Sequence, residues 1–208
     1  MTRVVEELGS PSVEQPEHSF AGRTDRAIIS DYFRLHAMDD NAENFVTFRD
    51  RFLAELPRQL EERRGDVLPG VRQTLDRLVR RDDMRVGLLT GNLRLAAKLK
   101  LRHFDLAHYF YRDERAIGGF GDEHHDRDDV ARAALADARD MWNPHLSGDD
   151  IWVVGDTPLD VKCARAISAR VIGVATGGYS EAQLTHAGAD LVVPNLDQAQ
   201  AWWERLAA

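Results

Sequence analysis

The segment Ile151–Asp160 reads Ile-Trp-Val-Val-Gly-Asp-Thr-Pro-Leu-Asp, and it decides the fold that the sequence predicts. Its first four residues are apolar, which is typical of a strand buried on both faces. Asp156 ends this strand, and Pro158 opens a helical pattern that places Asp160 in the first turn. Ligands of parallel α/β sheets bind beyond the carboxyl ends of the strands, where two carboxylates suit Mg²⁺. The simpler alternative is a loop acid followed by an acid that a helix N-terminus favours.

The composition indicates a globular protein and argues against several classes of function. The 208 residues include 43% hydrophobic and 30% charged side chains, which fits one domain or a core with a smaller insertion. The net charge of -8 argues against broad nucleic-acid binding, and no apolar run reaches membrane-spanning length. The single cysteine, Cys163, falls on the apolar side of a helix pattern. We therefore expect a packed thiol in a cytoplasmic protein with neither a nucleic-acid nor a membrane partner.

The first third of the chain has helical periodicity without a predicted strand. Met1–Leu8, Asp25–Leu35 and Phe45–Leu56 carry apolar residues at helical spacing. The aromatic residues among them favour a helix–helix core over a substrate pocket. A polar stretch and turn residues follow and predict a hinge, so we place a helical domain at residues 1–66 and an α/β domain at residues 67–208.

The α/β domain alternates strands and helices, which predicts a parallel sheet with helices on both faces. Besides residues 151–154, we expect strands at Met84–Leu89, Tyr109–Ile117, Arg170–Ala175 and Leu191–Val193. We expect helices at Val71–Val79, from Asp128 to about Trp142, and around Trp202 and Trp203.

Two loops of this domain carry candidate anion-binding residues. Thr90, Gly91 and Asn92 join a strand to a helix, where free N–H groups and a missing side chain let an anion approach. An ordinary turn is the alternative. Arg127 follows a loop that also contains His124 and His125, and its guanidinium suits phosphate oxygens. Adjacent histidines seldom converge on one ion, so we do not expect a metal site in that loop.

These motifs resemble those of the haloacid dehalogenase superfamily, most of all its phosphoglycolate-phosphatase-type members. Leu88–Asn92 is similar to the second motif, whose Ser or Thr binds the transferred phosphoryl group. Arg127 matches the Lys or Arg of the third motif, and Gly155–Asp160 is similar to the fourth, whose acids hold Mg²⁺. Ser19–Asp25 resembles the start of the second cap helix, and Val174–Gly178 resembles the loop after the fifth core strand.

The resemblance implies a three-layer, Rossmann-like α/β core with a helical cap that closes over the site. It also implies an Mg²⁺-dependent phosphatase that acts on a small phosphorylated metabolite through an aspartyl-phosphate intermediate. The implied catalytic residues are Thr90 and Arg127, the phosphate-binding residues are Thr90, Gly91, Asn92 and Arg127, and the metal ligands are Asp156 and Asp160.

The sequence departs from the family at the first motif, an apolar strand that ends in Asp-x-Asp-x-Thr or Val and supplies the nucleophile. Residues 126–130 match the letters but open a helix, and Asp39-Asp40 and Asp82-Asp83 have the wrong spacing. We therefore expect the first core strand to be missing, with two strand edges unpaired, through a start codon assigned too late. A non-catalytic phosphate- or partner-binding relative is the alternative, and a dehalogenase is a weaker third reading.

Overall fold

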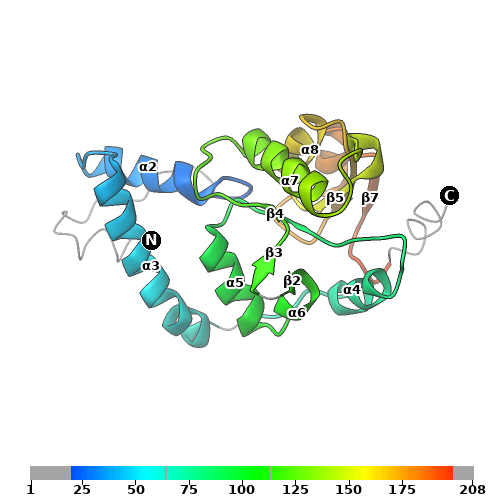
Figure 1. Cartoon of the computed structure of the whole chain (residues 1–208), viewed down its shortest axis with the longest axis horizontal. Helices are drawn as coiled ribbons and strands as arrows, with labels where there is room; N and C mark the ends of the chain where they lie inside the picture. The colour runs from blue at the N-terminus through cyan, green and yellow to red at the C-terminus, as the bar shows by residue number, and fades with distance from the viewer. Residues whose placement is uncertain (1–19, 64, 113, 199–208) are drawn as a thin grey trace.

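Two helices form one end of the molecule in the computed structural model, which describes residues 20–63, 65–112 and 114–198. They are α2 (Asp25–Leu35) and α3 (Ala42–Glu62), and Figure 1 shows them apart from the strands. Phe33 and Phe48 are fully buried between them and meet edge to face, with ring centroids 5.8 Å apart. The aromatic side chains therefore form a helix–helix core, as the spacing predicts. The helices expected at Met1–Leu8 and around Trp202 lie outside the described residues.

The α/β part confirms the alternation of strands and helices, but its strands form three small sheets instead of one. A parallel pair joins β1 (Leu88–Leu89) to β4 (Gly118–Gly119), a hairpin joins β2 (Tyr111–Arg112) to β3 (Arg115–Ala116), and a parallel sheet contains β5 (Trp152–Gly155), β6 (Arg170–Val174) and β7 (Leu191–Val193) in that order. Among the described strands, β1 and β5 each have a partner on one edge only. The same holds for the other end strands of these sheets, β2, β3, β4 and β7, so the missing first-motif strand stays a prediction.

Six further helices surround these strands: α4 (Val71–Val79), α5 (Arg94–His103), α6 (Ala107–Phe110), α7 (Arg127–Met141), α8 (Pro158–Arg165) and α9 (Glu181–His186). In Figure 1, α7 and α8 lie side by side next to β5, and α4 lies apart from them, below β7 in this view. Val161 and Ala164 of α8 pack on Val153 and Val171, while Ile172 belongs to a separate apolar cluster with Leu196. Helix α8 thus packs on one face of the sheet, and the cluster around Ile172 lies on the other.

Two predicted strands differ from the structure. The strand expected at Tyr109–Ile117 is wrong, because α6 ends at Phe110 and the following residues fold into the β2–β3 hairpin. Glu114 has a φ of 67° in the hairpin turn, a conformation that interrupts any continuous strand. The strand expected at Met84–Leu89 is confined to its last two residues, since its ladder partner β4 is itself only two residues long.

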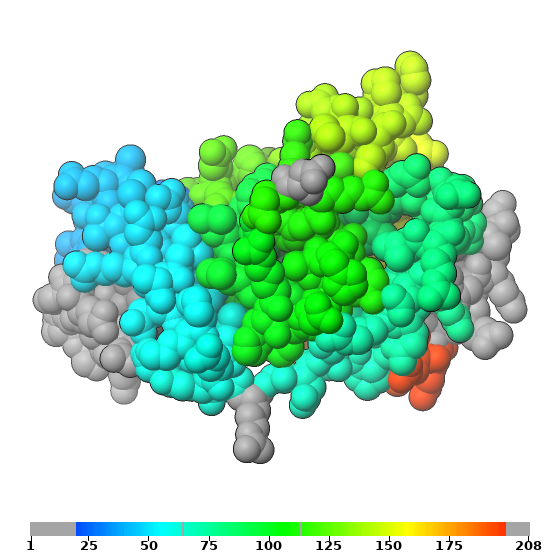
Figure 2. Space-filling view, turned by 60° about the horizontal axis from the view of Figure 1, so that its bottom comes forward, coloured from blue at the N-terminus to red at the C-terminus, as the bar shows by residue number. Residues whose placement is uncertain are grey.

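The helical end also packs against the α/β part. Leu56 of α3 shares a buried cluster with Leu93 and Ala96 at the start of α5. Figure 2 shows the same closeness, with the surface of α3 pressed against the middle of the chain. The division at residue 66 stays a prediction. None of the described helices is both long enough and apolar enough to cross a bilayer.

Candidate active site

The start of α8 holds Asp160 in a local hydrogen-bond network. Thr157 is the N-cap, and together with Asp160 it forms a capping box. Asp160 Oδ2 accepts hydrogen bonds from the N–H groups of Asp156 (3.1 Å) and Thr157 (3.0 Å) and from the Thr157 hydroxyl (2.9 Å). Its side chain is only 6% exposed. One oxygen of this predicted metal ligand is therefore fully engaged inside the protein.

Arg127, the first residue of α7, engages the other oxygen of Asp160. One arm of its guanidinium forms an ion pair with Asp160 Oδ1, and the other donates to the Gly22 carbonyl oxygen at 3.1 Å. The Arg127 side chain is 13% exposed, and its Nε is buried without an oxygen or nitrogen acceptor among the described residues. The Cys163 thiol packs nearby in α8, where burial raises its pKa. The sequence thus placed Arg127 and Asp160 at one site, as the structure does.

Asp156 completes this group at the carboxyl end of β5. Its side chain is half-buried, and burial is the main cause that raises the pKa of its carboxyl group. The negative charge of Asp160 raises the pKa further, while the charge of Arg127 lowers it. The two carboxylates and the guanidinium therefore lie close enough to act on one another electrostatically.

The donor set suits only part of a metal site. The described residues contain no group of three or more His, Cys, Asp and Glu side chains that could hold a metal ion. Mg²⁺ in enzymes commonly takes one or two carboxylates and completes its shell with water and substrate phosphate. Asp156 fits that role as a single ligand. Asp160 does not fit as a direct ligand in this conformation, because both of its oxygens are engaged.

The loop of residues 90–92, called the Thr90 loop below, joins β1 to α5. The Thr90 hydroxyl accepts a hydrogen bond from the Asn92 N–H at 3.1 Å, and the Thr90 N–H donates to the Gly119 carbonyl at 3.1 Å. A Cβ on Gly91 would lie 2.1 Å from the Arg23 carbonyl oxygen, so glycine is needed there for a close backbone approach. The Asn92 N–H therefore positions the Thr90 hydroxyl, whereas the Arg23 carbonyl oxygen takes the space beside Gly91 that the sequence assigns to an anion.

The N-terminus of α5 is occupied by two carboxylates. The helix has no side-chain cap of its own. The N–H of Leu93 donates to Asp25 Oδ2 at 2.8 Å, and the N–H of Arg94 donates to Asp122 Oδ2 at 2.9 Å. The side chain of Asn92 bonds to Asp25 and Lys100. An anion bound here would therefore have to compete with groups of the protein itself.

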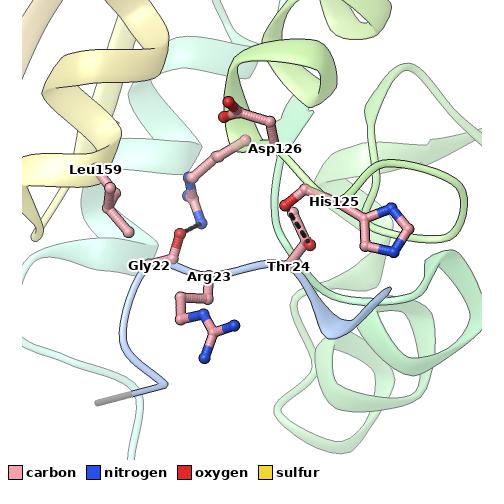
Figure 3. Close-up of a pocket in the computed structure, with 7 residues that line it drawn as sticks. Gly22, Arg23, Thr24, His125, Asp126 and Leu159 are labelled. Atoms are coloured by element: carbon pink, nitrogen blue, oxygen red, sulfur yellow. Dashed lines mark hydrogen bonds between the residues drawn. The ribbon is translucent and has the colours of Figure 1, made fainter. Parts of the chain in front are cut away.

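A short segment, which the sequence resemblance places at the start of a cap helix, contacts both the start of α8 and the Thr90 loop. Residues 22–25, called the strap, run from the start of α8 to the start of α5. Figure 3 shows two of the hydrogen bonds of the strap beside the pocket, one at Gly22 and one at Thr24. Gly22 has a φ of 74°, and a Cβ there would lie 2.7 Å from Thr157 Oγ1. The Thr24 hydroxyl donates to the His125 carbonyl at 3.1 Å, and the Asp25 N–H donates to the Gly91 carbonyl at 2.6 Å.

A hollow of about 290 Å³ lies beside the strap, lined by Gly22, Arg23, Thr24, His125, Asp126, Arg127 and Leu159. The His125 ring contacts the Ser30 hydroxyl at 2.9 Å, so this histidine bridges to α2. The sequence signals for the strap are the resemblance of Ser19–Asp25 to the start of a cap helix and the N-cap Thr24 followed by an acid, and neither predicts its contacts with the site.

The sequence matches the haloacid dehalogenase-like hydrolase family over residues 6–165. The chain belongs to this family. Three solved structures share the fold: a hydrolase from Pseudomonas syringae (18% identity, 99% of this chain and 89% of that chain, TM-score 0.69), a predicted phosphatase from Clostridium acetobutylicum (24%, 100% and 90%, 0.67) and a phosphonoacetaldehyde hydrolase-like protein from Oleispira antarctica (15%, 99% and 83%, 0.65). No curated protein matches.

Proposed function

We propose that this haloacid dehalogenase-like hydrolase is a phosphatase for a small phosphorylated metabolite. One observation carries the proposal: the Arg127 guanidinium and the carboxylates of Asp156 and Asp160 converge at the carboxyl end of β5. A planar guanidinium binds phosphate oxygens through paired hydrogen bonds, and nearby carboxylates hold divalent cations. The names of the structural relatives, a hydrolase and a predicted phosphatase among them, agree with this class of reaction.

Each residue has a distinct role in the proposal. The Thr90 hydroxyl, the Gly91 amide and Arg127 bind and orient the phosphoryl oxygens, while the Asn92 N–H, which donates to the Thr90 hydroxyl, orients that hydroxyl. Asp156 would hold Mg²⁺, which when bound neutralises charge on the phosphoryl group. Asp160 orders the backbone of residues 156–157 through its three hydrogen bonds and thereby fixes the position of Asp156.

The nucleophile of the proposed reaction is an aspartate, which attacks phosphorus and breaks the bond from phosphorus to the substrate's ester oxygen, so that the protonated alcohol leaves. Water then hydrolyses the resulting acyl phosphate to inorganic phosphate and the free carboxylate. The described residues do not include a first-motif aspartate. A strand that pairs with the free edge of β1 or β5 would bring such an aspartate to the same sheet edge as Asp156. We propose that a preceding Asp-x-Asp strand supplies this group.

The test compares the 208-residue chain with a form extended at its N-terminus by an apolar strand that ends in Asp-x-Asp-x-Thr. We expect Mg²⁺-dependent release of phosphate from an aryl phosphate by the extended form only. The control replaces the first aspartate of the added motif by asparagine and should be inactive. Equal turnover by the unextended chain would refute the role of the added aspartate.

A non-catalytic phosphate- or partner-binding role is the second candidate. It is favoured by the contacts of Arg127 with Asp160 and of Asn92 with Thr90 and Asp25, which occupy expected ligand-binding groups. Saturable binding of inorganic phosphate without turnover by the extended form would support it.

For either candidate we propose a cytoplasmic protein without a nucleic-acid or membrane partner, because the chain is acidic and its single cysteine is buried.

A further inference from the structure

Asp25, the first residue of α2, bonds to three consecutive residues at the end of β1. Its N–H donates to the Gly91 carbonyl at 2.6 Å. Its Oδ1 accepts from the Asn92 side-chain amide at 3.4 Å, and its Oδ2 accepts from the Leu93 N–H at 2.8 Å. Asp25 therefore contacts the Thr90 loop in two ways. Its backbone N–H bonds to Gly91 within the loop, and its carboxylate bonds to Asn92, the last residue of the loop, and to Leu93, the residue after it.

These bonds reach Thr90 through one further contact. The Asn92 N–H donates to the Thr90 hydroxyl oxygen, so the orientation of that hydroxyl depends on where Asn92 lies. The next residue after Asp25 extends the attachment, because the Arg26 N–H donates to the Gly121 carbonyl and the Gly121 N–H donates to the Asn92 carbonyl. The position of Thr90 is thus tied to the start of α2.

The surroundings of Asp25 make its carboxylate more than a surface cap. The residue is 5% exposed, and α5 has no side-chain cap of its own. Burial is the main cause that raises the pKa of Asp25, and the charge of Asp122 adds a smaller rise. The hydrogen bond from the Leu93 N–H and the charge of Lys100 lower this pKa. Without the Asp25 carboxylate, the Leu93 N–H would be a buried donor with no partner, which is costly.

We propose that Asp25 is a positioning residue that holds the Thr90 loop in its phosphate-binding geometry. The inference rests on the proposed function, since it concerns the loop assigned there to the phosphoryl group. Asp25 does not contact the phosphoryl group in this scheme; it acts through Gly91, Asn92 and Leu93. It also links the helical end to the site, because any movement of α2 away from α5 would release the Leu93 N–H.

The first experiment measures amide hydrogen exchange of Leu93 by NMR in the 208-residue chain. Asp25→Ala should speed this exchange by roughly tenfold or more, since the amide loses a charged acceptor. Asp25→Asn keeps an acceptor oxygen and should restore exchange to within about threefold of wild type. The matched control is Asp190→Ala, which removes a carboxylate that accepts from the Val171 N–H at 2.7 Å at the opposite end of the parallel strands. That control should leave Leu93 unaffected.

The second experiment titrates inorganic phosphate into the same variants and follows the Thr90 and Gly91 amide signals. Asp25→Ala should weaken phosphate binding by roughly tenfold, because a displaced loop loses oriented donors. Asp25→Asn should recover most of the affinity, and Asp190→Ala should bind as wild type does. A purely structural role would lower the affinity of both alanine variants alike, and this result would overturn the inference.

The two proposals fail in distinguishable ways. Unchanged Leu93 exchange in folded Asp25→Ala would overturn the positioning role, whatever the phosphate affinity. If Asp25→Ala does not fold, the Leu93 amide exchange of Asp25→Asn tests the positioning role instead. Exchange in that variant as fast as in the denatured chain would overturn the role. Absence of phosphate binding by the wild-type chain would count against the proposed function alone, since Leu93 exchange still reports on Asp25.

Discussion

The starts of α8 and α5 are both contacted by the strap but are capped in opposite ways. Helix α8 carries its own cap, because Thr157 and Asp160 are three positions apart and bond to each other. Helix α5 has no local cap and takes its acceptors from Asp25 and Asp122, which are 68 and 28 positions away from the residues they bind. The backbone N–H groups at the starts of both helices have acceptors, but only those of α8 find an acceptor in a neighbouring residue of the sequence.

This difference shows how the site is held together. The α8 end can form as soon as its own first turn forms, since a capping box is local. The α5 end is complete only when the strap and the loop before α7 have docked on it. The Thr90 loop therefore depends on tertiary structure, whereas the backbone beside Asp156 is ordered by its own segment and then fixed by Arg127.

The largest effect is expected from Arg127→Ala, which removes the ion pair between α7 and the locally capped start of α8. Asp160 would remain buried with an unpaired charge, and breaking such a pair costs about 3–5 kcal/mol of unfolding free energy. Urea denaturation would measure the loss. Arg132→Ala in the same helix breaks an exposed pair with Asp129 and should cost less than about 0.5 kcal/mol. Similar losses for both variants would show that the Arg127 pair is not special.

A smaller loss is expected from Thr157→Ala, which removes the local cap itself. The hydroxyl donates to Asp160 Oδ2 and accepts from the Asp160 N–H, and capping threonines contribute about 1–2 kcal/mol. The comparison variant is Thr185→Ala, an exposed threonine in α9 that bonds to the Glu181 carbonyl. Chemical denaturation of both would place the loss at the cap. A Thr157→Ala protein as stable as wild type would mean that Arg127 alone holds Asp160.

The smallest change is expected from Asp25→Asn, and it should depend on pH. Because the pKa of folded Asp25 is raised above the ordinary value of 3.8, protonation stabilises the folded state. This contribution is complete below 3.8 and is lost as pH rises through the folded pKa. The stability of wild type relative to Asp25→Asn should therefore fall as pH increases. Unfolding free energies measured across that range should show a downward trend; an upward trend would mean that Lys100 and the Leu93 N–H outweigh burial.

Much of the site was predictable because its signals are local. Asp156 and Asp160 follow an apolar strand and a helix-opening proline, and both lie where that pattern puts them. Thr90 and Arg127 likewise stand at the carboxyl side of β1 and at the start of α7. Residue order and strand-end placement predict where these four residues lie along the elements, while their roles in a site stay a prediction.

The partners of these residues could not be predicted in the same way. The sequence put Arg127 and Asp160 at one edge but gave no reason for them to bind each other instead of a ligand. The role of Asp25 was missed because its acceptor function depends on a helix far along the chain. The strand expected at Tyr109–Ile117 was wrong for a related reason: aromatic residues favour strands and hairpins alike, and the turn at Glu114 has no glycine or asparagine to mark it.

The strap has a consequence for the order in which the molecule folds. Its contacts join residues that are distant along the chain: Gly22 with Arg127, 105 positions apart, and Thr24 with His125, 101 positions apart. Contacts that close such long loops are slow to form, because the entropy of loop closure opposes them until the partners are already in place. The strap is therefore expected to dock last, after α7 and α8 have packed on β5. Refolding would then pass through a species with a native-like β5–β7 sheet and a Thr90 loop that is not yet ordered. Phosphate binding would therefore be regained later than most of the helical circular-dichroism signal.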